Sequence, residues 1–373
     1  MVHTGRLEAS PAGPAALYEQ IDDLLRLRAQ AFPRREEPTW SQLDAALGEL
    51  ASRLRALAGA GETTAPPRRD ELLARPVFVV GYPKSGTTLV LGLLDGHPQL
   101  TVVPGETRWF TDPEPTLEAL HEHWIRYLVN PSGQEPFWLL GRPGVGADPY
   151  LAFTERLLGH AADGDLLAAL VAAFAAPGAR VWVEKTPLHV FQVDRIRRRF
   201  SAARFVHVVR DPQATVAAIR RFGGHGWSTD VDETLDGVAR ALAQATDPPD
   251  GYLVVRYEDV VTAPERELRR VADFAGVDWS ESLLRPTLAG APMRANSAWL
   301  ERRVVGEIHD QSLEHELDRR TLALVHARTS RAARALGYDL PRVGRIRAAA
   351  IEATERLRRL TDTRRPNRTS TRD

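Results

Sequence analysis

The stretch "VVGYPKSGTTLVLGLLDGHPQL", from Val79 to Leu100, indicates the fold more clearly than any other part of the chain. Apolar β-branched residues precede a glycine turn, and the apolar run "LVLGLL" follows it, which is the pattern of a buried strand that leads through a tight turn into a helix. Gly81 and Gly86 keep the spacing of an ATP-binding phosphate loop, but the lysine, Lys84, stands before the second glycine instead of after it. The stretch therefore predicts an anion site, and it leaves open whether the anion is ATP or a different phosphorylated donor.

The turn contains the groups that an anion needs. Gly86 lets the backbone curl, and the amides of residues 85–88 point into the curl, where the following helix adds its positive end. Lys84 adds a full charge from the other side of the loop. The residues expected to bind the anion are Lys84, Ser85, Gly86, Thr87 and Thr88. The alternative is that Gly-Thr-Thr only turns a strand into a capped helix.

Four short apolar runs, "PVFVVGY", "RVWVEK", "ARFVHVVR" and "GYLVVRY", alternate with helix-like segments. This alternation is typical of a parallel sheet that is covered on both faces. We expect an α/β fold with a P-loop-type central parallel sheet flanked by helices over residues 76–340. Over residues 1–75 we expect an N-terminal helical hairpin and a linker. Residues 341–373 predict a basic C-terminal helix and a disordered tail.

The composition limits the classes of function. The 373 residues contain 49 Lys and Arg and 49 Asp and Glu, so no overall positive field attracts nucleic acid or an anionic membrane. Since the chain has no cysteine, it has neither a thiolate zinc site nor a cysteine nucleophile. No run reaches the roughly 18–20 apolar residues of a membrane span, and the first residues lack the apolar core of a signal peptide. We expect a cytoplasmic protein, and the Ala- and Arg-rich composition indicates a bacterial source.

A second anion site is predicted in "RFVHVVRDPQATVAAIRRF", from Arg204 to Phe222. An apolar strand ends at Arg210, and Asp-Pro begins a helix. An arginine at the carboxyl end of a strand can hold a phosphate with two parallel hydrogen bonds. The alternative for Arg210 is an ion pair at the surface.

"PKSGTTL" followed by "LLDGHP" resembles the 5′-phosphosulfate loop of the sulfotransferases that use 3′-phosphoadenosine-5′-phosphosulfate (PAPS). The similarity is to the branch that contains bacterial sulfotransferase-family proteins and protein-tyrosine sulfotransferases. In that family the basic residue in the Lys84 position touches the sulfate-bearing end of the donor, and Arg-Asp-Pro holds the 3′-phosphate. The resemblance therefore implies that Arg210 binds the 3′-phosphate. The family usually has a serine where this chain has Ala218, and Thr215, one helical turn earlier, is the expected substitute.

The chain offers two residues for the reacting centre. Glu106, in "PGETRWF", is the expected general base, because tyrosine sulfotransferases carry their catalytic glutamate before a Thr-Arg pair and because a carboxylate can accept the acceptor's proton. Lys185, in "VWVEKTPLH", resembles the family lysine that neutralises the leaving phosphate. His189 is the alternative base. For Glu106 and Lys185 the alternative is an ordinary surface role.

The remaining motifs follow in family order. In "VVRYEDVV", Tyr257 and Glu258 are expected to pack or to orient other residues. The candidate for the adenine-side loop is "PMRANSAWLERR", with Arg294 and Ser297 as possible donor contacts.

The motifs together predict a PAPS-dependent sulfotransferase that moves a sulfuryl group in line to a hydroxyl of a small molecule, glycan or lipid. No metal is expected, because lysines and amides supply the positive charge. Neither a nucleic acid nor a membrane span is expected, and the sequence does not indicate an oligomeric state. The alternatives are a P-loop kinase or ATPase, which needs a lysine after Gly86, and a catalytically silent nucleotide-binding module.

Overall fold

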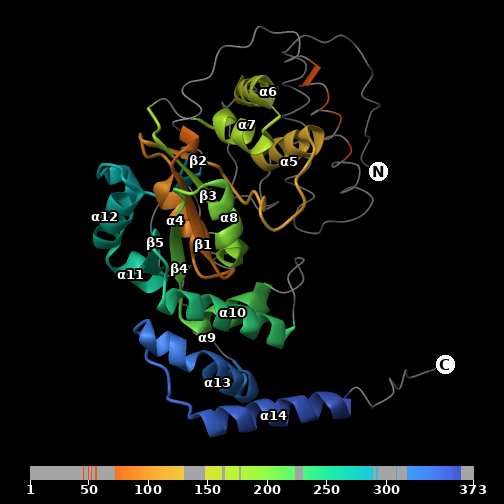
Figure 1. Ribbon diagram of the computed structural model, residues 1–373, viewed down its shortest axis with the longest axis vertical. Coiled ribbons are helices and arrows are strands. Elements are labelled where there is room, and N and C mark those ends of the chain that lie inside the picture. Colours follow the sequence, from red (N-terminus) through yellow and green to blue (C-terminus); the bar gives the residue numbers. More distant parts are fainter. Residues whose placement is uncertain are drawn as a thin grey trace, which may run out of the picture. The chain divides into compact units, whose positions relative to one another are not determined.

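The computed structural model describes the central part of the chain and most of its C-terminal region (Figure 1). The expected N-terminal helical hairpin lies almost wholly outside the described residues, as do Arg294, Ser297 and the expected disordered tail. The described residues are 45, 49, 52, 55, 56, 72–129, 148–161, 164–175, 178–222, 230–288, 291–292, 308 and 317–362.

Five strands form one sheet in the order β2-β3-β1-β4-β5, and the pairs β2–β3, β1–β4 and β4–β5 run parallel. The predicted central parallel sheet is confirmed. β-branched and aromatic residues dominate the four longer strands, and β1 and β3 are buried along their whole length, as a sheet covered on both faces requires. The strands are β1 Pro76–Gly81, β2 Leu100–Val102, β3 Val181–Lys185, β4 Arg204–Val209 and β5 Tyr252–Arg256.

Helices fill the connections between these strands. A two-stranded antiparallel ribbon, β6 Thr287–Leu288 and β7 Ala291–Pro292, follows them in the chain. The helices are α4 Thr87–Leu94, α5 Leu117–Val129, α6 Asp148–Ala161, α7 Leu166–Ala173, η2 Pro187–Gln192, α8 Val193–Arg199, α9 Pro212–Phe222, α10 Val231–Thr246, α11 Tyr257–Thr262, α12 Pro264–Ala275, η3 Glu281–Leu284, α13 Arg319–Ala335 and α14 Arg345–Asp362, where η marks a 3₁₀ helix. No described helix combines the length and apolar character that crossing a membrane requires.

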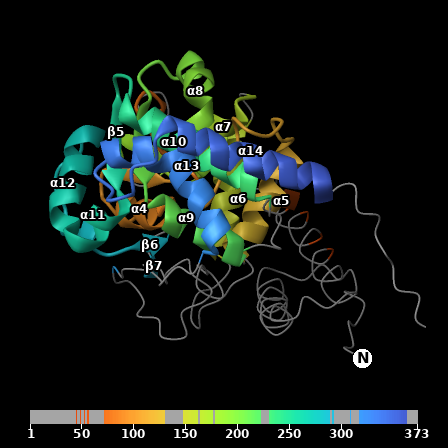
Figure 2. The same cartoon turned by 90° about the horizontal axis from the view of Figure 1, so that it is seen from below.

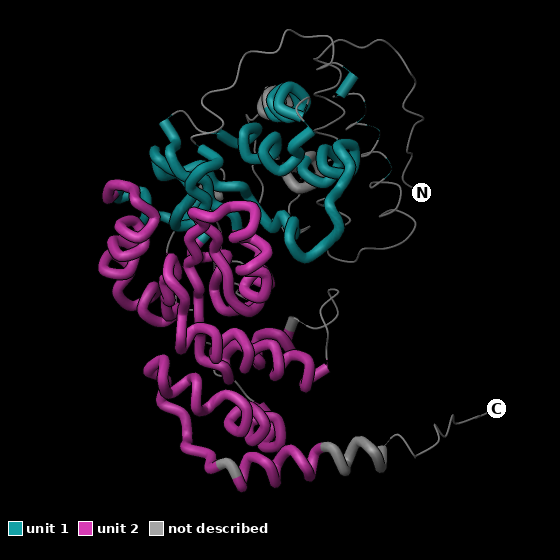
Figure 3. The backbone as a smooth tube through the Cα atoms, viewed as in Figure 1, with its two compact units in different colours: residues 1–76, 91–184, 280–307 teal, residues 77–90, 185–279, 308–373 magenta. Residues whose placement is uncertain are grey.

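The chain forms two compact units, which Figure 3 shows in different colours. Unit 1 consists of residues 1–76, 91–184 and 280–307, and unit 2 of residues 77–90, 185–279 and 308–373. Because each unit is assembled from separate segments of the chain, the boundaries expected at residues 75 and 340 stay predictions.

Unit 2 contains the strands and loops that matter most for the site. Its core joins the end of β4 to α9, α10 and α13, through residues such as Val209, Val216, Leu242 and Val325. Helix α13 packs against α10 and against α14 (Figures 1 and 2). This apolar layer supports the helix that begins just after Arg210.

Candidate active site

The residues predicted for the site come directly after the strands or at their ends. Lys84 follows β1, Glu106 follows β2, Lys185 ends β3, Arg210 follows β4 and Tyr257 follows β5. Ligands of open α/β sheets bind outside the carboxyl ends of the strands. Within unit 2, this placement is the first structural reason to consider Lys84, Lys185, Arg210 and Tyr257 together.

The glycine loop, residues 81–88, is held by its own backbone. The Ser85 amide donates to the Tyr82 carbonyl at 3.1 Å, and the Leu89 amide donates to the Gly86 carbonyl at 3.0 Å to begin α4. Lys84 has φ of 69° and Gly86 has φ of 102°, both in the left-handed region. For a lysine this conformation costs on the order of 1–2 kcal/mol, and such strain gathers at ligand-binding loops.

Close packing explains why this loop needs its two glycines. A Cβ atom on Gly81 would lie 2.5 Å from the backbone oxygen of Val208. A Cβ atom on Gly86 would lie 2.4 Å from Cδ2 of Tyr257. Since no side chain fits at either position, the backbone curls closely against β4 and against the tyrosine ring.

Ser85 provides the clearest sign that the loop binds a ligand. It is 3% exposed, and its hydroxyl has no hydrogen-bond partner among the residues that the structure describes. A buried hydroxyl left in this state costs about 1–3 kcal/mol. An anion in the curl of the loop would accept this hydrogen bond, and the loop is therefore compatible with the phosphosulfate end of a nucleotide.

Arg210 contacts the glycine loop directly. It is 8% exposed, its Nη1 donates to the Lys84 carbonyl oxygen at 3.2 Å, and its guanidinium lies 4.5 Å from the centre of the Tyr257 ring. The register places Gly81 beside Val208, so the residues that follow β1 and β4 meet. The structure thus brings the two predicted anion sites into contact, with Tyr257 against both Gly86 and Arg210.

The start of α9 lies next to this arginine and is firmly capped. The Asp211 carboxylate accepts from the amides of Gln213 and Ala214 at 2.7 and 3.0 Å. The hydroxyl of Thr215 donates to the Asp211 carbonyl oxygen at 2.9 Å. The only hydroxyl proton of Thr215 is therefore used within the helix, and its contact with a 3′-phosphate stays a prediction.

Lys185 ends β3 and is 4% exposed. Pro187 then begins η2, as expected for a proline in the first turn of a helix. His189, in η2, is fully buried, and its ring packs edge-on against Phe78 with the ring centres 6.2 Å apart. This position favours a packing role for His189 over the role of a base.

Glu106 belongs to unit 1 and is half-buried. The residue after it, Thr107, is held by the carboxylate of Glu184, a role that the sequence motifs did not predict. Thr107 donates from its amide and its hydroxyl to Oε1 of Glu184, at 3.2 and 2.9 Å. Glu184 is 1% exposed. The sequence signal for this role was an acid inside the apolar strand "VWVEK", because a buried charge needs hydrogen-bonded partners.

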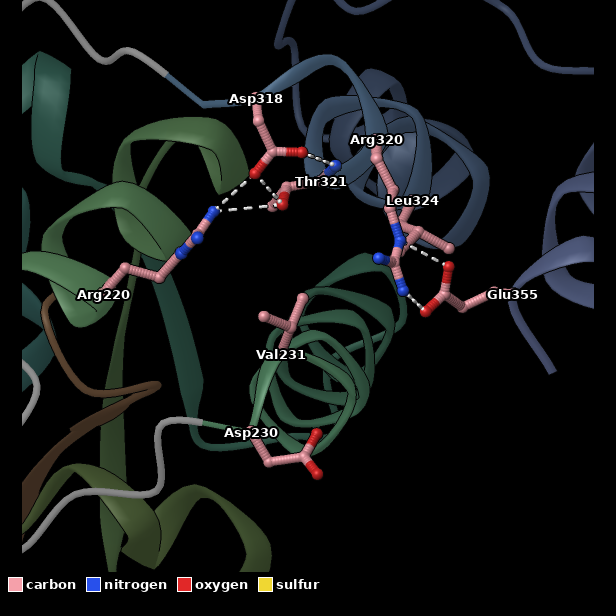
Figure 4. Close-up of a pocket in the computed structure, with 8 residues that line it drawn as sticks. All are labelled: Arg220, Asp230, Val231, Asp318, Arg320, Thr321, Leu324 and Glu355. Carbon is pink, nitrogen blue, oxygen red and sulfur yellow. Dashed lines mark hydrogen bonds and ion pairs between the residues drawn. The ribbon is translucent and has the colours of Figure 1, made fainter. Parts of the chain in front are cut away.

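A separate cavity of about 330 Å³ lies in unit 2 (Figure 4). Four of the five charged side chains that line it form ion pairs: Arg220 contacts Asp318 at 2.9 Å, and Arg320 pairs with Glu355. Because both arginines already have acidic partners, the cavity is a weaker anion site than the glycine loop. Its lining consists of Arg220, Asp230, Val231, Asp318, Arg320, Thr321, Leu324 and Glu355.

The parallel sheet, the strained glycine loop and the buried arginine define an α/β protein whose loop has the features of an anion site. The model of the sulfotransferase family matches residues 76–281, which is more than half of the chain. The chain belongs to the sulfotransferase family. The family prediction made from the motifs is confirmed, and sulfuryl transfer is the reaction class.

Curated relatives and solved structures are similar to the chain at low identity. Protein-tyrosine sulfotransferase 1 of Danio rerio is 25% identical over 304 residues, which covers 76% of this chain and 79% of the relative. The omega-hydroxy-beta-dihydromenaquinone-9 sulfotransferase Stf3 of Mycobacterium tuberculosis is 28% identical over 247 residues, covering 54% of this chain and 63% of that protein. The sulfotransferase domain from the curacin biosynthetic pathway is 19% identical with a TM-score of 0.43, over 71% of this chain and 98% of the domain.

Proposed function

We propose that the chain transfers a sulfuryl group from PAPS to a hydroxyl of a small-molecule, glycan or lipid acceptor. The observation that carries this proposal is the contact between the buried Arg210 and the backbone of the glycine loop. PAPS carries anionic groups on both the 5′ and the 3′ side of its ribose, whereas ATP has no 3′-phosphate. Two adjoining anion sites therefore fit PAPS better than ATP.

The glycine loop binds the 5′-phosphosulfate in this proposal. Ser85, whose buried hydroxyl has no partner among the described residues, donates to the ligand together with the amides at the start of α4. Lys84 contributes its positive charge near the sulfate. Arg210 binds the 3′-phosphate with its guanidinium, which the Tyr257 ring holds from one face.

The transfer step needs a base and a group that stabilises the leaving phosphate. The acceptor oxygen attacks the sulfur in line while the bond between sulfur and the 5′-phosphate oxygen breaks. Glu106 takes the hydroxyl proton, and Lys185 neutralises the charge that develops on the departing 3′-phosphoadenosine-5′-phosphate (PAP). Among the described residues, no group of three or more acidic or histidine side chains is arranged to hold a metal. In the proposed mechanism the cationic side chains and amides stabilise the charge.

The acceptor is proposed from chemistry and from relatives. One relative is named for protein tyrosine and the other for a hydroxylated menaquinone, so both names describe sulfation of a hydroxyl group. The equal numbers of acidic and basic residues give no general attraction for a polyanionic acceptor. A neutral hydroxylated metabolite, glycan or lipid is the class that we propose.

Calorimetric titration with PAP, ATP and AMP tests the donor. We expect PAP to bind more tightly than AMP, and Arg210→Ala to weaken PAP binding by about 10- to 100-fold while AMP binding changes little, because the arginine contributes a charged hydrogen bond. ATP binding as tight as that of PAP, or PAP binding unchanged in Arg210→Ala, would contradict the proposal. Incubation with PAPS and pools of hydroxylated compounds, read by a mass increase of one sulfuryl group, identifies the acceptor.

A further inference from the structure

Glu258 connects three separate parts of unit 2. It lies in the first turn of α11, directly after Tyr257. One carboxylate oxygen, Oε1, accepts from the amide of Asp211 at 2.9 Å. The other, Oε2, accepts from the hydroxyl of Tyr338 at 3.0 Å. Both oxygens are thus occupied by donors from distant parts of the chain.

The hydrogen bond to Asp211 acts on Arg210. The peptide bond between these residues is planar, so an acceptor that holds the Asp211 amide also fixes the carbonyl end of Arg210. The ring of Tyr257 meanwhile lies under the guanidinium at 4.5 Å. Two consecutive residues, Tyr257 and Glu258, therefore hold the arginine at its side chain and at its backbone.

Tyr338 in turn holds the carboxylate. Its ring is 5% exposed and belongs to the apolar core that contains α9, α10 and α13. Burial and the neighbouring Glu258 raise the pKa of the Tyr338 hydroxyl, which therefore keeps its proton and remains a donor. The guanidinium of Arg256 lies over the Tyr338 ring, 4.4 Å from the ring centre. The orientation of Glu258 is thus fixed by a rigid core.

We propose that Glu258 is the positioning residue of the 3′-phosphate site and that Tyr338 fixes its orientation. Glu258 does not touch the donor in this scheme and acts through Arg210, whose backbone it holds through Asp211. The proposal rests on the proposed function, because it assigns Arg210 to the 3′-phosphate. It adds a residue and a C-terminal segment on which recognition of that phosphate depends.

Paired titrations of the full chain with PAP and AMP test this role, because the two ligands differ in the 3′-phosphate. We expect Glu258→Ala to weaken PAP binding by about tenfold and AMP binding by less than about twofold, since a misplaced group loses a charged hydrogen bond. Glu258→Gln is the conservative variant: its amide oxygen accepts from Asp211, and its NH₂ donates to the Tyr338 oxygen. We expect this variant to bind PAP nearly as well as the wild type.

Two further variants keep the test decisive if Glu258→Ala does not fold. Tyr338→Phe removes only the hydroxyl, and we expect PAP binding to weaken about two- to threefold with AMP unchanged. The double variant Arg210→Ala/Tyr338→Phe is expected to bind PAP like Arg210→Ala alone, because Tyr338 acts only through the position of Arg210. Glu265→Ala is the matched control, because this exposed acid on α12 pairs with Arg269 and is not part of the site. Its PAP affinity should equal that of the wild type.

The outcomes separate this proposal from the proposed function. If the wild type does not distinguish PAP from AMP, the assignment of Arg210 to the 3′-phosphate fails and the positioning role fails with it. If Arg210→Ala loses PAP binding but Tyr338→Phe and Glu258→Ala bind PAP normally, only the positioning role is overturned. Equal losses of PAP and AMP binding in Glu258→Ala would show a general structural role and would also overturn the proposal.

Discussion

Replacing Ser85 by alanine is predicted to change stability and ligand binding in opposite directions. The Ser85 hydroxyl is buried and has no hydrogen-bond partner within the described part of the chain. Removing it also removes the cost of an unsatisfied polar group, so we expect the free energy of unfolding to rise by about 1–2 kcal/mol. Natural sites often lose stability to retain a functional group of this kind.

The same substitution should weaken PAP binding. A hydrogen bond from the hydroxyl to a charged phosphate oxygen contributes about 1.5–3 kcal/mol, which corresponds to roughly a 10- to 150-fold increase in the dissociation constant. Urea or thermal unfolding without ligand measures the first effect, and calorimetric titration with PAP measures the second.

A matched control separates this effect from serine replacement in general. Ser282 has a hydroxyl that is already hydrogen-bonded to Ser280 at 2.9 Å. Ser282→Ala should lower the stability slightly and leave PAP binding unchanged. The reasoning on Ser85 would be refuted if Ser85→Ala were less stable than the wild type and bound PAP with unchanged affinity.

Three further predictions follow from individual contacts. Gly86→Ala should lose about 2–5 kcal/mol of stability, measured by urea unfolding, because its Cβ would meet the Tyr257 ring at 2.4 Å in a left-handed backbone conformation. Glu184→Ala should lower kcat about 10- to 100-fold with PAP affinity unchanged, measured by steady-state kinetics and titration, because Thr107 loses its acceptor and the proposed base, Glu106, moves. Burial lowers the pKa of His207 to about 3. As the pH falls, the unfolded chain therefore takes up a proton at His207 before the folded protein does. The free energy of unfolding should fall by at most about 1.4 kcal/mol per pH unit as the pH drops from 6.5 toward 3.

Each of these predictions has a contradicting result. Gly86→Ala with wild-type stability would show that the Tyr257 ring yields without cost. A Glu184→Ala variant that keeps the wild-type kcat would show that the hydrogen bonds from Thr107 to Glu184 are not needed for catalysis. His207→Phe should reduce the slope of stability against pH. Part of the remaining slope is expected from His121, whose pKa burial lowers to about 4, and from His326, whose pKa burial also lowers. An unchanged slope would contradict the assignment to His207.

The sequence predicted most of the sheet because the information is local. Four of the five strands are β-branched apolar runs long enough to be recognised, and each forms a strand. The fifth, β2, has only three residues, too few to show a pattern of its own. Its position depends on pairing with β3, a contact between residues about 80 positions apart.

The roles in the site were predictable to different degrees. The glycine spacing that predicted the loop lies within eight residues, so it was visible without a structure. Glu184 was visible only as an acid in an apolar strand, and its partner Thr107 lies 77 positions away. The motif "VVRYEDVV" predicted that Glu258 packs or orients other residues, but its partners, Asp211 and Tyr338, lie 47 and 80 positions away and were not predicted.

By itself the sequence predicted that a strand, a glycine turn and a helix form an anion loop, and that a second strand leads through Arg210 into another helix. These features depend on backbone conformations and side-chain patterns over a few residues. Only the tertiary structure decided that Arg210 donates to the Lys84 carbonyl across 126 positions and shares the Tyr257 ring with Gly86. The physical reason is the parallel register of β1 and β4, which sets Gly81 beside Val208 and so brings the glycine loop and Arg210 into contact.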